Sequence, residues 1–142
     1  LLPIDVGGLY RSVDGGKNWT ISMRGWHARG ANGFAIDPRN ANRVLGIGGN
    51  SLHWNGDWGP SPHGVYLSTN KARSWKHVVA VRDGLNGQIA FDASSYDAAK
   101  KFCTRAYYAT PLSGLLRSDD GGQSWKRVSD IAAQQRLDEH NP

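Results

Sequence analysis

One phrase occurs three times in this chain, and it constrains the fold more than any other feature. It reads GLYRSVDGGKNWT at 8–20, GVYLSTNKARSWKHV at 64–78 and GLLRSDDGGQSWKRV at 114–128. The copies recur roughly every 50 residues, and strand-like content at that period is typical of the blades of a β-propeller. The 18 glycines and 6 tryptophans in 142 residues agree with an all-β chain that has tight turns.

Each repeat unit divides into short strands, so the predicted fold class is all-β: a partial β-propeller of about three four-stranded blades. The first unit supplies only three strands, and Asp37 and Asp92 hold corresponding places in the other two. Weak helical spacing occurs at 97–102 and in the tail. The predicted division is a partial blade at 1–31, blades at 32–82 and 83–130, and a tail at 131–142. The predicted strands are 1–5, 8–12, 18–23, 33–37, 43–49, 64–68, 74–81, 88–92, 101–110, 114–118 and 124–129.

The repeated phrase lies at the turn between the third and fourth strands of each unit, and its chemistry predicts a structural role. A short carboxylate or amide can accept hydrogen bonds from backbone N–H groups of its own turn, and the serine can hold a neighbouring backbone group. The tryptophan can wedge between adjacent sheets. Asn70 replaces the aspartate in the second copy, which favours structure over catalysis, because asparagine keeps the acceptor but not the charge. The residues with this predicted role are Ser12, Asp14, Gly16, Trp19, Ser68, Asn70, Trp75, Ser118, Asp120, Gly122 and Trp125.

Composition argues against several classes of protein. The net charge is +5, but the 17 lysines and arginines are scattered, which is typical of a solvated surface and not of a nucleic-acid interface. Cys103 is the only cysteine, so the chain has neither an internal disulfide nor a thiolate zinc site. No apolar window approaches the ~18 residues of a membrane span. We expect no nucleic-acid partner, no membrane partner and no cofactor.

The three copies resemble Asp-box (BNR) repeats, which mark β-propellers such as sialidases, the sortilin group, photosystem assembly factors and the xyloglucanases of glycoside hydrolase family 74. The segments IDVGGLYRSVDGGKNWT (4–20) and NGFAIDPRNANRV (32–44) resemble the first blade of the family-74 enzymes. That resemblance implies that Asp5, in the DVGG loop, is a catalytic aspartate. It also places the second catalytic aspartate in a second propeller, which this chain is too short to contain. Sialidase function fits less well, because no RIP segment is present.

Propeller topology predicts where a ligand would bind. The loops between strands two and three, and between four and one, share one face, away from the repeated turns. This face has tryptophans, histidines and acids, which suit stacking on sugar rings and hydrogen bonding to hydroxyls. Packing of the loop is an equally good interpretation of Trp54 and Trp58, and His53, His63 and Asp57 are an alternative, weaker metal set. The predicted substrate-binding residues are Trp26, His27, Arg29, His53, Trp54, Asp57 and Trp58.

Two classes of function follow. The first is a glycoside hydrolase-like propeller segment that binds or cleaves a β-glucan such as xyloglucan. Inverting hydrolysis needs two carboxyl groups ~6.5–9.5 Å apart, so we expect weak or no turnover from this chain alone. The second is a non-catalytic module that binds glycan or protein, or builds an assembly. We expect further propeller blades, from a longer polypeptide or from other copies, as partners. The resemblance implies an extracellular or periplasmic location.

Overall fold

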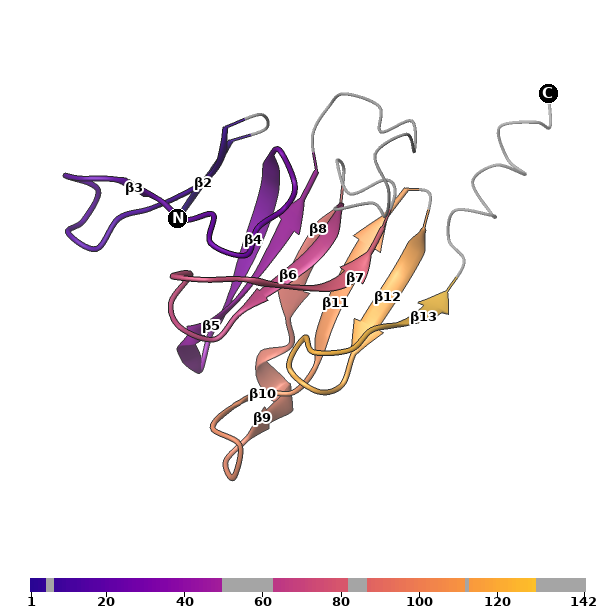
Figure 1. Ribbon diagram of the computed structural model, residues 1–142. Helices are drawn as coiled ribbons and strands as arrows, with labels where there is room; N and C mark the ends of the chain where they lie inside the picture. The colour runs from indigo at the N-terminus through magenta and orange to yellow at the C-terminus, as the bar shows by residue number, and fades with distance from the viewer. Residues whose placement is uncertain (5–6, 50–62, 82–86, 112, 130–142) are drawn as a thin grey trace, which may run out of the picture.

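The computed structural model describes residues 1–4, 7–49, 63–81, 87–111 and 113–129, and in these residues the chain is nearly all β (Figure 1). Three antiparallel sheets of three or four strands follow one another along the described part of the chain, and a fourth sheet is a two-stranded hairpin. Sheet 1 contains β1 (Leu2–Ile4), β2 (Gly8–Arg11) and β3 (Thr20–Ile21). Within the described ranges, no helix is long and apolar enough to cross a membrane.

Sheets 2 and 3 each have four strands in the order of a meander. Sheet 2 contains β4 (Ala31–Asp37), β5 (Asn40–Gly48), β6 (Gly64–Ser68) and β7 (Lys76–Ala80). Sheet 3 contains β8 (Gln88–Phe91), β11 (Ala106–Thr110), β12 (Gly114–Ser118) and β13 (Lys126–Ser129). The all-β class is therefore confirmed, and each of these strands overlaps a predicted one.

The connection between β8 and β11 differs from the prediction. Residues 101–110 do not form one strand, and residues 97–102 do not form a helix. Instead the 3-10 helix η2 (Ala93–Ser95) leads into a small hairpin of β9 (Tyr96–Asp97) and β10 (Phe102–Cys103). The Asp92 carboxylate caps η2 by accepting from Ser94 N, and the Asp97 carboxylate accepts from two N–H groups of the hairpin turn. These local side-chain bonds outweigh the weak helical spacing.

Sheet 2 lies between the other two sheets and is buried on both faces (Figure 1). Tyr66 of β6 faces a cluster that includes Leu9 of sheet 1, whereas its neighbour Val65 faces a cluster that includes Tyr108 of sheet 3. The side chains of Leu9, Val65, Tyr66 and Tyr108 are all fully buried. Successive side chains of a strand point to opposite faces, so β6 gives a hydrophobic side chain to each neighbouring sheet, which explains the unbroken hydrophobic run of residues 65–67.

The connections separate onto two ends of the sheets. At one end the β4–β5 turn meets the β9–β10 hairpin, where Asn40 Nδ2 donates to Lys101 O at 2.9 Å and Cys103 N donates to buried Asp37 at 2.9 Å. The repeated turns lie at this end too, because Gly121 N donates to Thr104 O. At the other end Gly49 N donates to Gly30 O. The described residues therefore follow the predicted division of loops.

Candidate functional site

The structure describes three of the eight residues predicted for catalysis or substrate binding. His27 and Arg29 are exposed in the connection between β3 and β4. Trp26 is only 5% exposed, and its ring stacks on Tyr66 with centroids 4.3 Å apart. The Trp26 ring is therefore part of the core between sheets 1 and 2, which disfavours the predicted contact of this side chain with substrate. The other predicted residues lie outside the described residues: Asp5, His53, Trp54, Asp57 and Trp58.

Room for Trp26 comes from glycines that the sequence pattern did not single out. A Cβ atom at Gly46 would lie 2.7 Å from Trp26 Cζ3, and one at Gly48 would lie 2.5 Å from the Tyr66 ring. Trp75 closes the same cluster, edge-on to Trp26 at 5.1 Å. The buried indole holds the β3–β4 connection against sheet 2, which fixes the backbone that carries His27 and Arg29. Trp26 is thus a positioning residue for this surface.

A histidine and a tyrosine of sheet 2 lie behind His27, and sequence reasoning missed both. Burial raises the pKa of Tyr66, whose hydroxyl lies against the backbone N–H groups of His27 and Ala28. Burial also lowers the pKa of His77, whose Nε2 lies 3.2 Å from His63 O and whose ring lies 4.7 Å from the Tyr66 ring. Both residues occupy predicted strands, so only the three-dimensional register brings them to this end of the sheet.

The three repeated turns have the same internal geometry, and we name them turn 1 (12–19), turn 2 (68–75) and turn 3 (118–125). In each turn the serine Oγ accepts from a backbone N–H four residues later, at 2.8–2.9 Å. In turn 3 the Asp120 carboxylate accepts from Gln123 N and Ser124 N, at 2.8 and 2.9 Å. Asn70 accepts from the equivalent donors of turn 2 through its Oδ1 atom. The amide thus does what the carboxylate does, and we propose that all three turns have structural roles.

The tryptophans of the turns differ in their surroundings. Trp75 is 6% exposed and donates at 2.9 Å to Ser22 O, directly after β3 of sheet 1, so it packs between two sheets as the wedge prediction requires. Trp125 is half-buried, donates to Gly122 O and lies edge-on to Tyr108. Trp19 is 43% exposed and bonds only within its own turn among the described contacts, to Gly16 O. The wedge interpretation therefore holds for Trp75 and not for Trp19.

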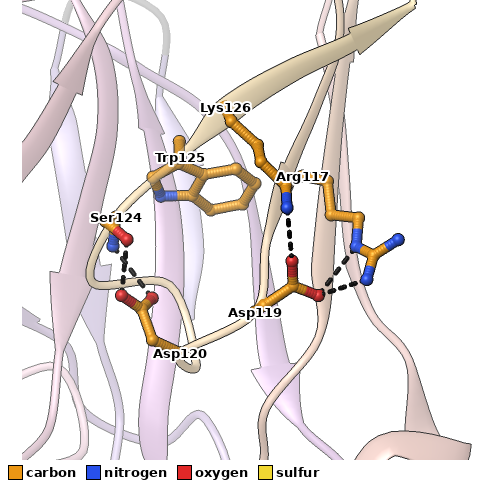
Figure 2. A pocket seen from close by; sticks show the side chains of 6 residues that line it. All are labelled: Arg117, Asp119, Asp120, Ser124, Trp125 and Lys126. Atoms are coloured by element: carbon orange, nitrogen blue, oxygen red, sulfur yellow. Dashed lines mark hydrogen bonds and ion pairs between the residues drawn. The ribbon is translucent and has the colours of Figure 1, made fainter.

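A pocket of about 250 Å³ opens beside turn 3, between Trp125 and a charged group. Figure 2 shows the indole of Trp125 above two separate carboxylates. Asp120 accepts from Ser124 Oγ, whereas Asp119 lies 2.5 Å from Arg117 Nη2 and 3.1 Å from Lys126 Nζ. Every charged group drawn in the pocket thus has a partner from the chain itself.

The electrostatics of this pocket do not suit acid–base catalysis. The hydrogen bond from Arg117 leads the interactions that lower the pKa of Asp119. Burial alone would raise the pKa of Asp120, but hydrogen bonds from Ser124, Ser118 and Gln123 outweigh it and lower the pKa. A glycosidase acid needs a raised pKa so that it keeps its proton at working pH. Two depressed carboxylates therefore leave the pocket without a general acid.

The described ranges contain no group of three or more histidine, cysteine or acidic side chains placed to hold a metal ion. Cys103 is buried, and burial raises the pKa of its thiol to about 11, which disfavours the thiolate that binds metals or attacks substrates. We name the end of the sheets away from the repeated turns the loop end; there the structure describes an exposed histidine and an exposed arginine, His27 and Arg29, on a connection anchored by Trp26. Such groups donate hydrogen bonds, which suits the recognition of hydroxyl-rich ligands.

Sequence comparisons link the chain to xyloglucanases. A xyloglucanase of Hypocrea jecorina (strain QM6a) is 27% identical over 139 residues, a match that covers 91% of this chain and 16% of the relative. A xyloglucanase of a Paenibacillus species is 27% identical over 129 residues, which cover 90% of this chain and 12% of the relative. No protein-family model matches the chain. The chain thus spans less than a fifth of the length of either relative.

Solved structures agree on the fold. The family-74 xyloglucanase of Xanthomonas campestris superposes with a TM-score of 0.66 at 25% identity, over 88% of this chain and 18% of that one. A family-74 enzyme of Niastella koreensis superposes with a TM-score of 0.67 at 22% identity, over 89% of this chain and 19% of that one. The chain therefore has a family-74-like β-propeller architecture, as the sequence resemblance implied.

Proposed function

We propose that the chain is a glycoside hydrolase-like propeller segment that acts on xyloglucan, with its glycan surface at the loop end of the sheets. The observation that carries this proposal is the match to two xyloglucanases along nine-tenths of the chain, on the same architecture. We infer that its substrate class is a β-glucan polysaccharide, and that it acts outside the cytoplasm, in an extracellular or periplasmic location.

Within this proposal, Asp5 is the catalytic carboxylate, and His27 and Arg29 are substrate-binding residues. The exposure of these two side chains on a connection anchored by Trp26 supports the second assignment. His53, Trp54, Asp57 and Trp58 complete the surface as sequence-based proposals. Glycan binding at turns 1–3 is disfavoured, because their carboxylates and amide are occupied by bonds within each turn.

We propose binding with weak or no turnover for this chain alone. An inverting reaction needs one carboxyl group as acid and another as base. The acids of the turn 3 pocket have depressed pKa values and accept bonds from neighbouring residues, so they do not supply the partner for Asp5. The second function class, a non-catalytic module that binds glycan or protein or builds an assembly, is favoured by this same observation.

Calorimetric titration with xyloglucan oligosaccharides tests the proposal. The double substitution Trp54→Ala/Trp58→Ala should weaken affinity at least tenfold, which is about 1.4 kcal/mol. The matched control is Trp19→Ala, which removes an exposed tryptophan from turn 1 and should leave affinity unchanged. Equal affinity in the double variant, or an equal loss in Trp19→Ala, would count against the proposed surface.

A turnover assay separates the two function classes. Release of reducing ends from xyloglucan that disappears in Asp5→Ala, while oligosaccharide affinity is retained, would support the hydrolase. Binding without turnover in both proteins would support the non-catalytic module. Absence of both binding and turnover with every β-glucan tested would refute the hydrolase and the glycan-binding form of the second class.

A further inference from the structure

An asparagine at the loop end of sheet 2, the sheet that is covered on both faces, has a polar side chain that the fold leaves without a partner. The pairing of β4 with β5 shifts between Ala31 and Gly33, and Asn32 is the residue that has no opposite number there. Such a β-bulge re-aims the side chain that it carries, and bulges are frequent next to active sites. Asn32 therefore occupies a position from which a strand can present a functional group.

The bulge lies close to the exposed side chains of the proposed glycan surface. Arg29 comes three residues before Asn32, a separation that the backbone spans in at most about 11 Å. Between them, Gly30 O accepts from Trp26 Nε1 at 3.3 Å and from Gly49 N at 3.1 Å. These bonds hold the start of β4 at the loop end, so one extended ligand can contact both Arg29 and Asn32.

The amide group of Asn32 differs from those of three other described asparagines, because it makes no hydrogen bond. Its Nδ2 atom is buried and has no acceptor in the described part of the chain. By contrast, the Nδ2 atoms of Asn18, Asn40 and Asn70 each donate to an acceptor, at 2.7, 2.9 and 2.8 Å. A buried donor without a partner costs free energy and is rare in folded proteins. Asn32 thus lowers the stability of the fold at the position that it occupies.

The bulge itself does not require asparagine. The backbone at Asn32 does not have the positive φ angle that asparagine tolerates better than most residues. Among the described contacts, its side chain also makes no bond to a nearby backbone group, unlike Asn40, whose Oδ1 accepts from Asn42 N at 3.1 Å. A partner from outside the chain, either a ligand or an ordered water, is what remains to explain the amide.

We propose that the carboxamide of Asn32 is a substrate-binding group, which donates a hydrogen bond to a hydroxyl or ring oxygen of the glycan beside Arg29. Asn32 thereby joins the glycan surface at the loop end, and its role rests on the proposed function. The residue as a whole is half-buried, and rotation about its terminal bond, which has a broad torsional preference, can bring Nδ2 from its covered position to the open side. A carboxamide offers both a donor and an acceptor, which suits sugar hydroxyl groups.

Calorimetric titration with xyloglucan oligosaccharides, together with thermal melting of the same proteins, tests this role. Asn32→Leu replaces the amide by an apolar group of similar shape. Affinity should fall about three- to tenfold, because one hydrogen bond to the ligand is lost. The melting temperature should stay the same or rise, because no buried donor is left without a partner. The matched control Asn42→Leu makes the same change at an exposed position near the opposite end of β5 and should leave affinity unchanged.

Nuclear magnetic resonance gives a readout that a structural role of Asn32 would not move. The side-chain NH2 signals of Asn32, assigned by their loss in Asn32→Leu, should shift saturably during titration with the same oligosaccharides. The NH2 signals of Asn42 should not shift. NH2 signals of Asn32 that stay unchanged while the chain binds ligand would show that water is the partner of the amide and would overturn the proposed contact.

The remaining outcomes separate this contact from the proposed function. Oligosaccharide affinity that Asn32→Leu retains in full overturns the role of Asn32 and leaves the glycan surface standing. A melting temperature that falls further in Asn32→Leu than in Asn42→Leu assigns the amide a partner within the chain and overturns its role as well. A wild-type chain that binds no xyloglucan oligosaccharide refutes the proposed function, and the role of Asn32 with it.

Discussion

Removal of the Asp120 carboxylate tests the structural role of the repeated turns, and turn 2 of the same chain, which has Asn70 at the equivalent position, suggests the control. In the folded protein this carboxylate accepts from Gln123 N, Ser124 N, Ser124 Oγ and Ser118 Oγ. Asp120→Ala removes all four bonds. Because Gln123 and Ser124 are exposed, water replaces part of what is lost, and the net cost per bond is about 0.5–1.5 kcal/mol. We expect the free energy of unfolding to fall by about 1–3 kcal/mol.

Asp120→Asn is the matched control, because turn 2 already contains this substitution. Asn70 Oδ1 accepts from Arg73 N and Ser74 N at 3.1 and 3.0 Å, and its Nδ2 donates to Ser74 Oγ at 2.8 Å. We therefore expect Asp120→Asn to keep most of the stability that Asp120→Ala loses. Urea unfolding of the three proteins at neutral pH, followed by circular dichroism, measures both effects.

The pH dependence of unfolding separates charge from geometry at this turn. The folded-state pKa of Asp120 is lowered, so the carboxylate contributes stability above its unfolded pKa of about 4, and this contribution is lost as pH falls through the folded pKa. The stability advantage of the wild type over Asp120→Asn should therefore shrink as the solution is acidified below about pH 4. Equal stability of wild type and Asp120→Ala, or an Asn variant as unstable as the Ala variant, would refute the structural role of Asp120 in turn 3.

Three further predictions concern the packing between sheets. Gly46→Ala should destabilise the fold by about 1–3 kcal/mol, because the new methyl group would lie 2.7 Å from Trp26. Gly33→Ala is the control and should be tolerated, because its methyl group would lie 3.4 Å from Ile47. Thermal melting compares the two variants. Arg43→Ala should lower the free energy of unfolding by about 1.5–3 kcal/mol or more, because it removes the buried hydrogen bond to Gly121 O. Arg39→Ala, which removes an exposed arginine, should lower it far less in the same urea assay. Equal losses would contradict the role of Arg43 between the sheets. Cys103, fully buried with a thiol pKa of about 11, should react with iodoacetamide at pH 8 only after unfolding, and rapid alkylation of the native chain would contradict its burial.

Much of the fold could be predicted from the repeated phrase. Its period located the strands of sheets 2 and 3, and the place of Asp37 and Asp92 aligned the two units. The β9–β10 hairpin could not be found this way, because it occurs in one unit only and depends on local bonds of Asp92 and Asp97. A sequence repeat indicates only the elements that its units share, so an insertion found in one unit cannot be predicted from the repeat.

Sequence reasoning assigned the connection with His27 and Arg29 to the end away from the repeated turns, where the structure also has it, but did not anticipate that Trp26 is buried. A tryptophan between glycines in a loop has the sequence pattern of an exposed aromatic residue. Its burial depends on Gly46 and Gly48 in another strand, which leave space for the ring against Tyr66. The hydrogen bond from Arg43 to Gly121 O was missed for a similar reason. Its acceptor lies in turn 3, which connects two strands of the next sheet.

The central claim is that a xyloglucan-type ligand binds at the loop end of the sheets and not at the repeated turns. Amide chemical-shift mapping of the 142-residue chain during titration with a xyloglucan oligosaccharide tests it most directly. We predict saturable shifts at His27 and Arg29 and in the segment with Trp54 and Trp58, with turns 1–3 unchanged. Shifts confined to turns 1–3, or none at a ligand concentration that saturates a full-length xyloglucanase, would contradict the claim.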